Sequence, residues 1–396
     1  MLSVRPSWRG GTACLAYVRP GRYSTSLVGR LGDPSMSLVK EPRLDKKFAE
    51  HFKDRLIMGR YGVIGQMFPH PLRAGLPLGL LHRSIDVLEE HVVPMLLNEG
   101  RIPMPDMSNV EEFREVVTGA DGNAVELHIA KPKDVAGDVP GILHLHGGGM
   151  TLMSTKDPLY RSLRARMARL GFVVVSVEFR NASGKLGRYP YPAGLNDCMS
   201  ALSWTHAHRR KLGISRLILS GESGGGNLCL STALRARREG RLHEFDGVFA
   251  LCPFIAGPRL WESAGDRGST SSTKLWLKSL RECRDYLICH ELVKVCARLY
   301  DPERRNEGDP CAWPLVAEAS DLRGLPPHVV SVNELDPLRD EGLAYCERLR
   351  EAGVRAESRT VLGTPHAGDL FAAAEPGVEH FFLETVGAMK SFADSL

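Results

Sequence analysis

Apolar and polar positions alternate most clearly in the middle third of the chain. Val125, Leu127 and Ile129 alternate with charged and polar neighbours, which is the period of a strand with one buried face. A turn at 121–123 (Asp-Gly-Asn) precedes this strand, and β-type patterning begins near Phe113. Short strands joined by such a turn predict a β-hairpin.

After the hairpin, apolar runs of strand length alternate with stretches of helical period. The expected strands are 142–145, 172–179, 216–220, 248–252, 328–332 and 355–361, and the expected helices are 158–170, 195–212, 227–239, 341–351 and 377–391. A repeated strand-helix-strand order favours a mostly parallel sheet with helices on both faces. The fold class predicted is therefore α/β.

The alternation suggests three regions. We expect an N-terminal segment at 1–33, a helical cap at 34–109 and a catalytic α/β domain at 110–396. Within the last region the alternation fails at about 255–314, where the sequence is helical and charged. A break of this length predicts an insertion that completes the cap. The alternative for 34–109 is a structural buttress without a role at a pocket.

Composition fits an ordinary soluble globular protein, with 43% hydrophobic and 25% charged residues among 396. No stretch reaches the roughly 18 continuous apolar residues of a membrane span, so no integral membrane segment is expected. The chain has 51 basic and 47 acidic residues; five and one of them fall in the first 33, so 46 of each remain. Residues 34–396 therefore carry no net formal charge, which gives no reason to expect nucleic acid as a partner.

The arginine-rich, acid-poor segment 1–33 has the composition of a mitochondrial transit peptide. The alternative is a tail that carries no address, which would leave the protein in the cytoplasm. The chain has nine cysteines, an odd number, and no C-x-x-C pair, so we expect a reducing intracellular compartment rather than a disulfide framework. Cys229 and Cys252 fall in apolar elements and are interpreted as core residues. The oligomeric state, including a homo-oligomer, stays open.

A G-x-S-x-G motif at 221–225 follows the predicted strand 216–220. This motif is typical of a sharp turn between a strand and a helix that exposes a serine hydroxyl. The motif alone is common by chance in glycine-rich turns. Ser223 is nevertheless the candidate nucleophile, because a second motif precedes it.

That second motif is His-Gly-Gly-Gly at 146–149, also directly after a predicted strand. Its bare amides can hold a carbonyl oxygen that becomes negative during acyl transfer. We predict an oxyanion hole formed by the amides of Gly147, Gly148 and Gly224. A phosphate site is the alternative for such a loop, but the chain lacks the nucleotide motifs G-x-x-x-x-G-K-[ST] and, after this loop, G-x-G-x-x-G.

A serine nucleophile requires a base, and an acid that orients the base. His366 lies in a loop after the last predicted strand, and Asp336 follows the strand 328–332. The chain order serine, aspartate, histidine is the order of hydrolases with this type of turn. Asp340 and Glu341 are alternative acids, although they are expected to begin the next helix.

No metal or other cofactor is predicted. His144 and His146 point to one face of a strand, but no third ligand cluster is visible, and His146 is expected to orient the glycine loop. Three apolar or aromatic residues near the strand ends are candidates for lining the substrate pocket, with core packing as the alternative for each: Met150, Tyr189 and Phe254.

These motifs together resemble the hormone-sensitive-lipase-like branch of the α/β-hydrolase serine esterases. The matching pieces are 146–149, 221–225, D-P-L-x-D-E-G from Asp336, and His366. Further segments, such as FALCPFIAG from 249, are similar to a bacterial member of this branch. The chain departs from the usual pattern in having Gly-Glu-Ser-Gly-Gly for Gly-Asp-Ser-Ala-Gly, and Phe179-Arg180 for Tyr-Arg.

The resemblance implies an α/β-hydrolase fold with a helical cap and hydrolysis of small or medium carboxylic esters or lactones through an acyl-enzyme. Ser223 would be the nucleophile, His366 the base and Asp336 the orienting acid. Two alternatives remain on the same fold. One is an amide hydrolase or deacetylase with the same triad, and the other is a non-catalytic ligand-binding receptor, which in this family lacks the catalytic histidine.

Overall fold

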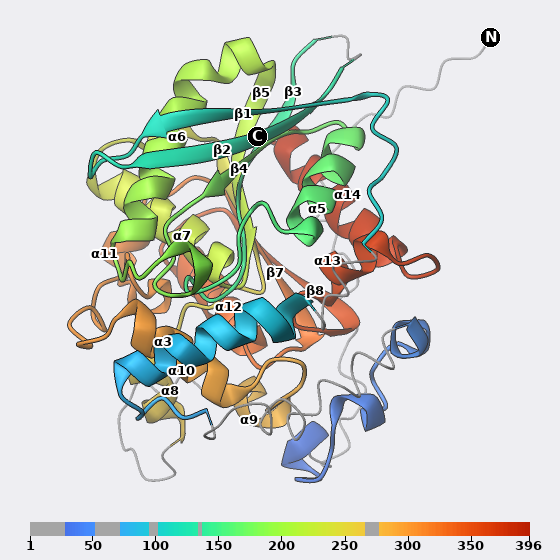
Figure 1. Ribbon diagram of the computed structural model, residues 1–396, viewed down its shortest axis with the longest axis vertical. Coiled ribbons are helices and arrows are strands. Elements are labelled where there is room, and N and C mark those ends of the chain that lie inside the picture. The colour runs from blue at the N-terminus through green and yellow to red at the C-terminus, as the bar shows by residue number, and fades with distance from the viewer. Residues whose placement is uncertain (1–27, 52–71, 95–101, 134–136, 266–276) are drawn as a thin grey trace.

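Eight strands form a single sheet in the computed structural model, which describes residues 28–51, 72–94, 102–133, 137–265 and 277–396 (Figure 1). The strands are β1 (Val110–Thr118), β2 (Ala124–Pro132), β3 (Val139–Leu145), β4 (Val173–Glu178), β5 (Ile214–Glu222), β6 (Gly247–Leu251), β7 (His328–Leu335) and β8 (Ala356–Pro365). Their order is β1-β2-β4-β3-β5-β6-β7-β8. The pairs β1–β2 and β2–β4 are antiparallel, and all other pairs are parallel. The predicted hairpin and mostly parallel sheet are confirmed.

Helices cover both faces of this sheet (Figure 1). One face carries α5 (Pro158–Arg169) and α14 (His380–Asp394), and the other carries α6 (Ala193–Leu212), α7 (Gly224–Arg238) and α12 (Arg339–Glu351). Every residue of β6 is buried because both of its faces are covered, as expected for a central parallel strand. The α/β class predicted from the sequence is confirmed.

Several elements are longer than predicted from the sequence, and three of the extensions lie at the carboxyl edge of the sheet. β5 continues to Glu222 and β7 to Leu335, and α7 begins at Gly224 rather than at 227. The apolar pattern stops before the polar end residues of these strands, although their backbones still pair. Glycines have low helix propensity, which hid the first turn of α7. These are the positions that carry the candidate chemistry.

Helical segments from two parts of the chain gather beyond the carboxyl ends of the strands (Figure 1). They are α3 (Leu78–Val87), a π-helical turn (Leu88–Val92), α8 (Gly257–Gly265), α9 (Ser279–Glu282) and α10 (His290–Tyr300). α3 packs against α10, so the N-terminal region contacts the insertion. We propose that they form one cap, with the boundaries expected from the sequence.

Some predictions concern residues outside the described ranges. The suggested transit peptide falls mainly on 1–27, the helical pattern after 51 falls on 52–71, and part of the insertion falls on 266–276. Among the described residues, no helix combines the length and apolarity needed to cross a bilayer. The eight cysteines in the described part of the chain are free thiols.

Candidate active site

Ser223 stands between β5 and α7, in a backbone conformation that side chains rarely adopt (φ 56°, ψ −117°). The neighbouring strand stabilises this turn on both sides, since the Ser223 amide donates to the Leu251 carbonyl and the Phe254 amide donates to the Ser223 carbonyl, both at 3.0 Å. Strained backbone of this kind is typical of functional turns. The turn lifts the Ser223 side chain off the carboxyl edge of the sheet.

The two outer glycines of G-x-S-x-G are required by close packing against β3. A Cβ atom on Gly221 would lie 2.2 Å from the Leu145 carbonyl oxygen, and one on Gly225 would lie 1.9 Å from the same atom. Neither contact can be relieved, because the oxygen belongs to the backbone of a central strand. The motif therefore brings the serine turn directly against the start of the glycine loop at 146–149.

His366 and Asp336 form a buried hydrogen-bonded pair. Nδ1 of His366 lies 2.8 Å from Oδ2 of Asp336, and the other oxygen of Asp336 accepts a hydrogen bond from the Leu338 amide at 2.8 Å. Burial lowers the pKa of His366, but Asp336 and the neighbouring Cys252 together outweigh burial, so that the pKa of His366 lies well above its usual 6.5. Because Nδ1 faces the carboxylate, Nε2 is the nitrogen available to accept a proton.

The two alternative acids have other partners. Asp340 accepts a hydrogen bond from the Ser279 amide and pairs with Arg339. Glu341 accepts the amide of Ile255 at 2.7 Å and the indole of Trp261 at 3.2 Å, and burial raises its pKa to about 8. Of the three acids, Asp336 is the one bonded to His366.

Asn333 is a site residue that the sequence analysis missed. It lies on β7 and is buried, and its side-chain oxygen accepts the Ala367 amide at 3.2 Å while its nitrogen donates to Thr364 Oγ1 at 2.8 Å. These bonds anchor the loop on both sides of His366. A polar residue inside an apolar strand is the signal that could have pointed to it.

The predicted oxyanion hole needs a correction at Gly147. Its amide donates to the Glu222 carboxylate at 2.6 Å and to the Tyr160 hydroxyl at 2.9 Å, so it is not available to a substrate oxygen. Within the described residues, the amides of Gly148, Gly149 and Gly224 have no such partner. Gly149 lies beside Gly224, since a Cβ on Gly224 would be 2.7 Å from the Gly149 nitrogen.

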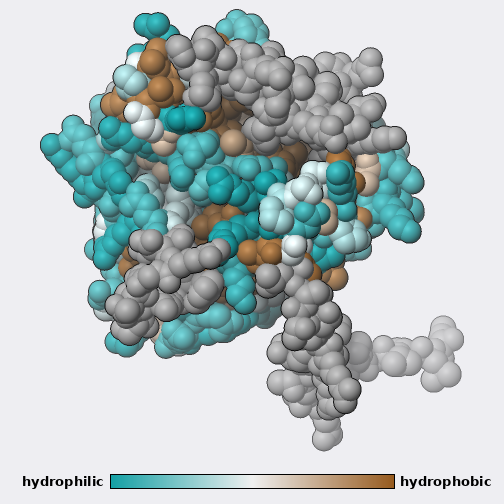
Figure 2. All heavy atoms as spheres, turned by 90° about the horizontal axis from the view of Figure 1, so that it is seen from below, coloured by the Kyte–Doolittle hydropathy of each residue, from teal (hydrophilic) through white to brown (hydrophobic). Residues whose placement is uncertain are grey.

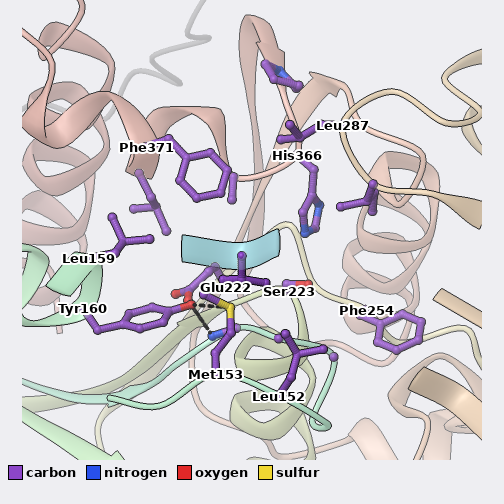
Figure 3. Close-up of a pocket in the computed structure, with 18 of the residues that line it drawn as sticks. Leu152, Met153, Leu159, Tyr160, Glu222, Ser223, Phe254, Leu287, His366 and Phe371 are labelled. Carbon is purple, nitrogen blue, oxygen red and sulfur yellow. Dashed lines mark hydrogen bonds between the residues drawn. The ribbon is translucent and has the colours of Figure 1, made fainter. Parts of the chain in front are cut away.

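Glu222, the residue before the serine, links the two glycine motifs. Besides accepting the Gly147 amide, its carboxylate lies 3.3 Å from Nε2 of His144, and its side chain is almost fully buried. Figure 3 shows Tyr160 and Glu222 meeting at this point beneath the cavity. In the sequence Glu222 stands out only as a change within the motif, whereas in the structure its contacts position the loop that carries Gly148 and Gly149.

Replacing Glu222 by alanine is expected to lower kcat by about 10- to 100-fold, with KM little changed, because the loop amides would lose their alignment with the developing oxyanion. Steady-state kinetics on a chromogenic ester measure this split. Glu222→Gln keeps an oxygen for the Gly147 amide and should recover most of the loss. An equal loss in both variants, or a rise in KM alone, would contradict a positioning role.

His146 supports the same loop, as expected from the sequence. Its ring stacks on Phe179 at 4.1 Å between centroids, and Nδ1 lies 2.9 Å from the Gly147 carbonyl oxygen. Burial lowers the pKa of His146 to about 4, so the ring is neutral at pH 7 and donates its proton to that carbonyl. Phe179, which replaces the tyrosine usual in the resembled family, provides the stacking face.

Ser223 and His366 line the same cavity, which has a volume of about 230 Å³. In Figure 3 the ring of His366 points toward Ser223, with Leu159 and Phe371 to one side and Phe254 to the other. The lining is overwhelmingly apolar. Seen from the cap side, hydrophobic side chains are visible in recesses between hydrophilic ones (Figure 2).

Of the three residues predicted to line the pocket, one lines the cavity in the structure and two do not. Phe254 lines the cavity. Met150 does not, because its side chain is 2% exposed and packs into the main core. Tyr189 is on the surface, 45% exposed, with its ring 5.4 Å from the guanidinium of Arg180. Proximity to a strand end along the sequence did not determine which way these two side chains point.

Comparison with known proteins shows the family to which the chain belongs. A family model described as the alpha/beta hydrolase fold matches residues 142–369, more than half of the chain. The chain belongs to the α/β-hydrolase family. The structure of a bacterial brefeldin A esterase, described as a homologue of human hormone sensitive lipase, superposes with a TM-score of 0.79 at 34% identity, covering 93% of this chain and 98% of the other. This places the hydrolase in the hormone-sensitive-lipase-like branch.

Relatives of known name are also esterases. The carboxylesterase NlhH of Mycobacterium tuberculosis is 29% identical over 294 residues, which cover 72% of this chain and 84% of the relative. An arylesterase of Saccharolobus solfataricus is 32% identical over 232 residues, covering 57% of this chain and 67% of the relative. The α/β-hydrolase described here is a carboxylic ester hydrolase.

Proposed function

We propose that this hydrolase cleaves uncharged, apolar carboxylic esters or lactones of small or medium size through an acyl-enzyme on Ser223. The observation that carries the proposal is the shared cavity: Ser223 and His366 line one apolar chamber, and His366 is bonded to Asp336 on its far side. A hydroxyl, a base with one free nitrogen and a buried carboxylate are the parts that acyl transfer requires.

In the first step, Nε2 of His366 takes the Ser223 proton while Oγ attacks the ester carbonyl carbon. The imidazolium that forms is stabilised by the carboxylate of Asp336, which stays ionised throughout the reaction. Oγ becomes bonded to carbon, and the carbonyl electron pair moves onto oxygen. Collapse of this tetrahedral species expels the alcohol, which receives the proton from His366. Water then repeats the sequence on the acyl-enzyme and releases the acid.

The negative oxygen of each tetrahedral species is bound by the amides of Gly148, Gly149 and Gly224. This set replaces the one predicted from the sequence, because the Gly147 amide is used by Glu222. Two of the donors belong to the glycine loop and the third to the first turn of α7. Donors of this kind typically contribute about 2.7–4 kcal/mol each to the transition state.

The lining of the cavity supports an apolar substrate. Leucine, valine, isoleucine and phenylalanine side chains from the sheet edge and the cap make up most of it: Leu88, Val93, Leu152, Leu159, Leu163, Phe254, Ile288, Leu292, Val293, Leu338, Leu370 and Phe371. Apart from the proposed base, its ionisable side chains are Tyr160, Glu222, Cys296 and Glu375, and no Lys or Arg is among them. Apart from the proposed base, an anionic substrate would therefore find no cationic side chain in the described lining.

A p-nitrophenyl butyrate assay beside the p-nitrophenyl ester of succinic acid tests this proposal. The anionic substrate should give a kcat/KM lower by a factor on the order of 100 or more, since an unpaired charge in an apolar cavity costs several kcal/mol. Equal rates on the two esters would contradict the apolar assignment. Butyryl p-nitroanilide, measured in parallel, separates ester from amide hydrolysis; a faster anilide would favour an amide hydrolase.

A further inference from the structure

Cys252 lies beside the proposed base and acid. It follows β6 directly, and β6 is placed between β5, which leads to Ser223, and β7, which leads to Asp336. Its amide donates to the Ser331 carbonyl at 2.7 Å, and its side chain is 1% exposed. The interpretation of Cys252 as a core residue, made from the sequence, describes its burial but not its neighbours.

One ligand atom each from Cys252, Asp336 and His366 lie within 4.8 Å of one another. Within the described ranges, no other group of three His, Cys, Asp or Glu residues comes this close. Thiolate sulfur, imidazole nitrogen and carboxylate oxygen are the three ligand types that Zn²⁺ prefers, with bonds of about 2.0–2.3 Å in a tetrahedral arrangement. Of the three residues, His366 lines the cavity, so the cluster lies directly behind the proposed base as seen from the substrate side.

We propose that Cys252, Asp336 and His366 form an inhibitory site for a thiophilic divalent cation of the zinc group. The ion reaches the site through the active-site cavity, and it is an inhibitor rather than a resident cofactor. On binding, the Cys252 thiol releases its proton to solvent and the sulfur donates an electron pair to the metal. Burial raises the pKa of this thiol, so the metal must displace a proton to bind.

Metal binding removes the base from the reaction. A neutral imidazole that gives one ring nitrogen to a metal keeps its proton on the other, so His366 can no longer accept the proton of Ser223. Asp336 is drawn to the cation and no longer stabilises an imidazolium. The inhibition part of this inference rests on the proposed function, whereas the metal binding does not.

Titration with Cd²⁺, followed by the ultraviolet charge-transfer absorption of a thiolate–cadmium bond, tests the binding. The wild-type protein should show a single saturable step that chelator reverses. Cys252→Ser replaces the thiol by a hydroxyl of similar shape and should abolish the step, while Ser223→Ala should keep it. Cys289→Ser is the matched control, because Cys289 is partly exposed and its loss removes only adventitious binding.

Inhibition of ester hydrolysis by Zn²⁺ is measured for the wild type, Cys252→Ser and Cys289→Ser. The half-inhibitory concentration, measured relative to each variant's own uninhibited turnover, should rise in Cys252→Ser by about 10- to 100-fold or more, since loss of even an outer-shell partner of a metal has an effect of that size. A cadmium band that persists in Cys252→Ser, or no band in the wild type, overturns the proposal. Absence of esterase activity together with the expected band would refute the proposed function and leave the metal site standing.

Discussion

Replacing Ser223 by alanine is expected to lower kcat for p-nitrophenyl butyrate by about 10⁶-fold, the loss seen when the nucleophile of an intact serine triad is removed. In the described lining the other hydroxyl is that of Tyr160, which is engaged by the Gly147 amide, so only binding and the oxyanion amides would remain, which leave a weak residual rate over water. Initial rates with purified protein measure the effect. Wild-type-like turnover in this variant would refute the nucleophile assignment.

Stability measurements keep this result interpretable. Ser223 has φ 56°, a conformation that costs about 1–3 kcal/mol for a residue with a side chain. Alanine retains this strain, so Ser223→Ala should melt near the wild-type temperature. Ser223→Gly relieves it and should be more stable than Ser223→Ala by about 1 kcal/mol, while being equally inactive. Intact-mass analysis after fluorophosphonate treatment should show labelling of the wild type and of neither variant.

Replacing Asp336 by asparagine is expected to lower the maximal kcat/KM by about 10⁴-fold, because the amide holds the wrong tautomer and does not stabilise the imidazolium. It should also move the acid limb of the pH profile. In the wild type the pKa of His366 is raised, and only the deprotonated ring is a base, so activity rises with pH through a value above 6.5. Loss of the Asp336 charge removes the largest contribution that raises this pKa, so the pKa falls and the limb shifts to lower pH.

Asp340→Asn is the control for this prediction. Asp340 lies in the same turn but pairs with Arg339 and the Ser279 amide, so its loss should change neither the maximal rate nor the acid limb. A profile of kcat/KM against pH for the three proteins decides the matter. If Asp340→Asn shows the larger loss, or if the acid limb of Asp336→Asn stays in place, the assignment of the orienting acid is wrong.

The sequence by itself determined the features of this protein that depend on local residue patterns or on the order of residues along the chain. The strand and helix periods gave the parallel sheet, because the period of apolar residues reflects which faces are buried. The two glycine motifs indicated a serine turn beside an amide-rich loop, because close backbone approach excludes a Cβ at Gly221 and Gly225. The order of Ser223, Asp336 and His366 along the chain predicted which strand ends carry them.

Only the tertiary structure decided which groups meet. The parallel pairing of β3 with β5 puts Glu222 on the Gly147 amide, which we propose removes that amide from the oxyanion hole. The position of β6 between β5 and β7 brings Cys252 to His366. The physical reason is the same in both cases. A contact between residues far apart in sequence depends on the order of strands in the sheet and on the direction of a side chain at a turn. The local pattern of residues determines neither of these.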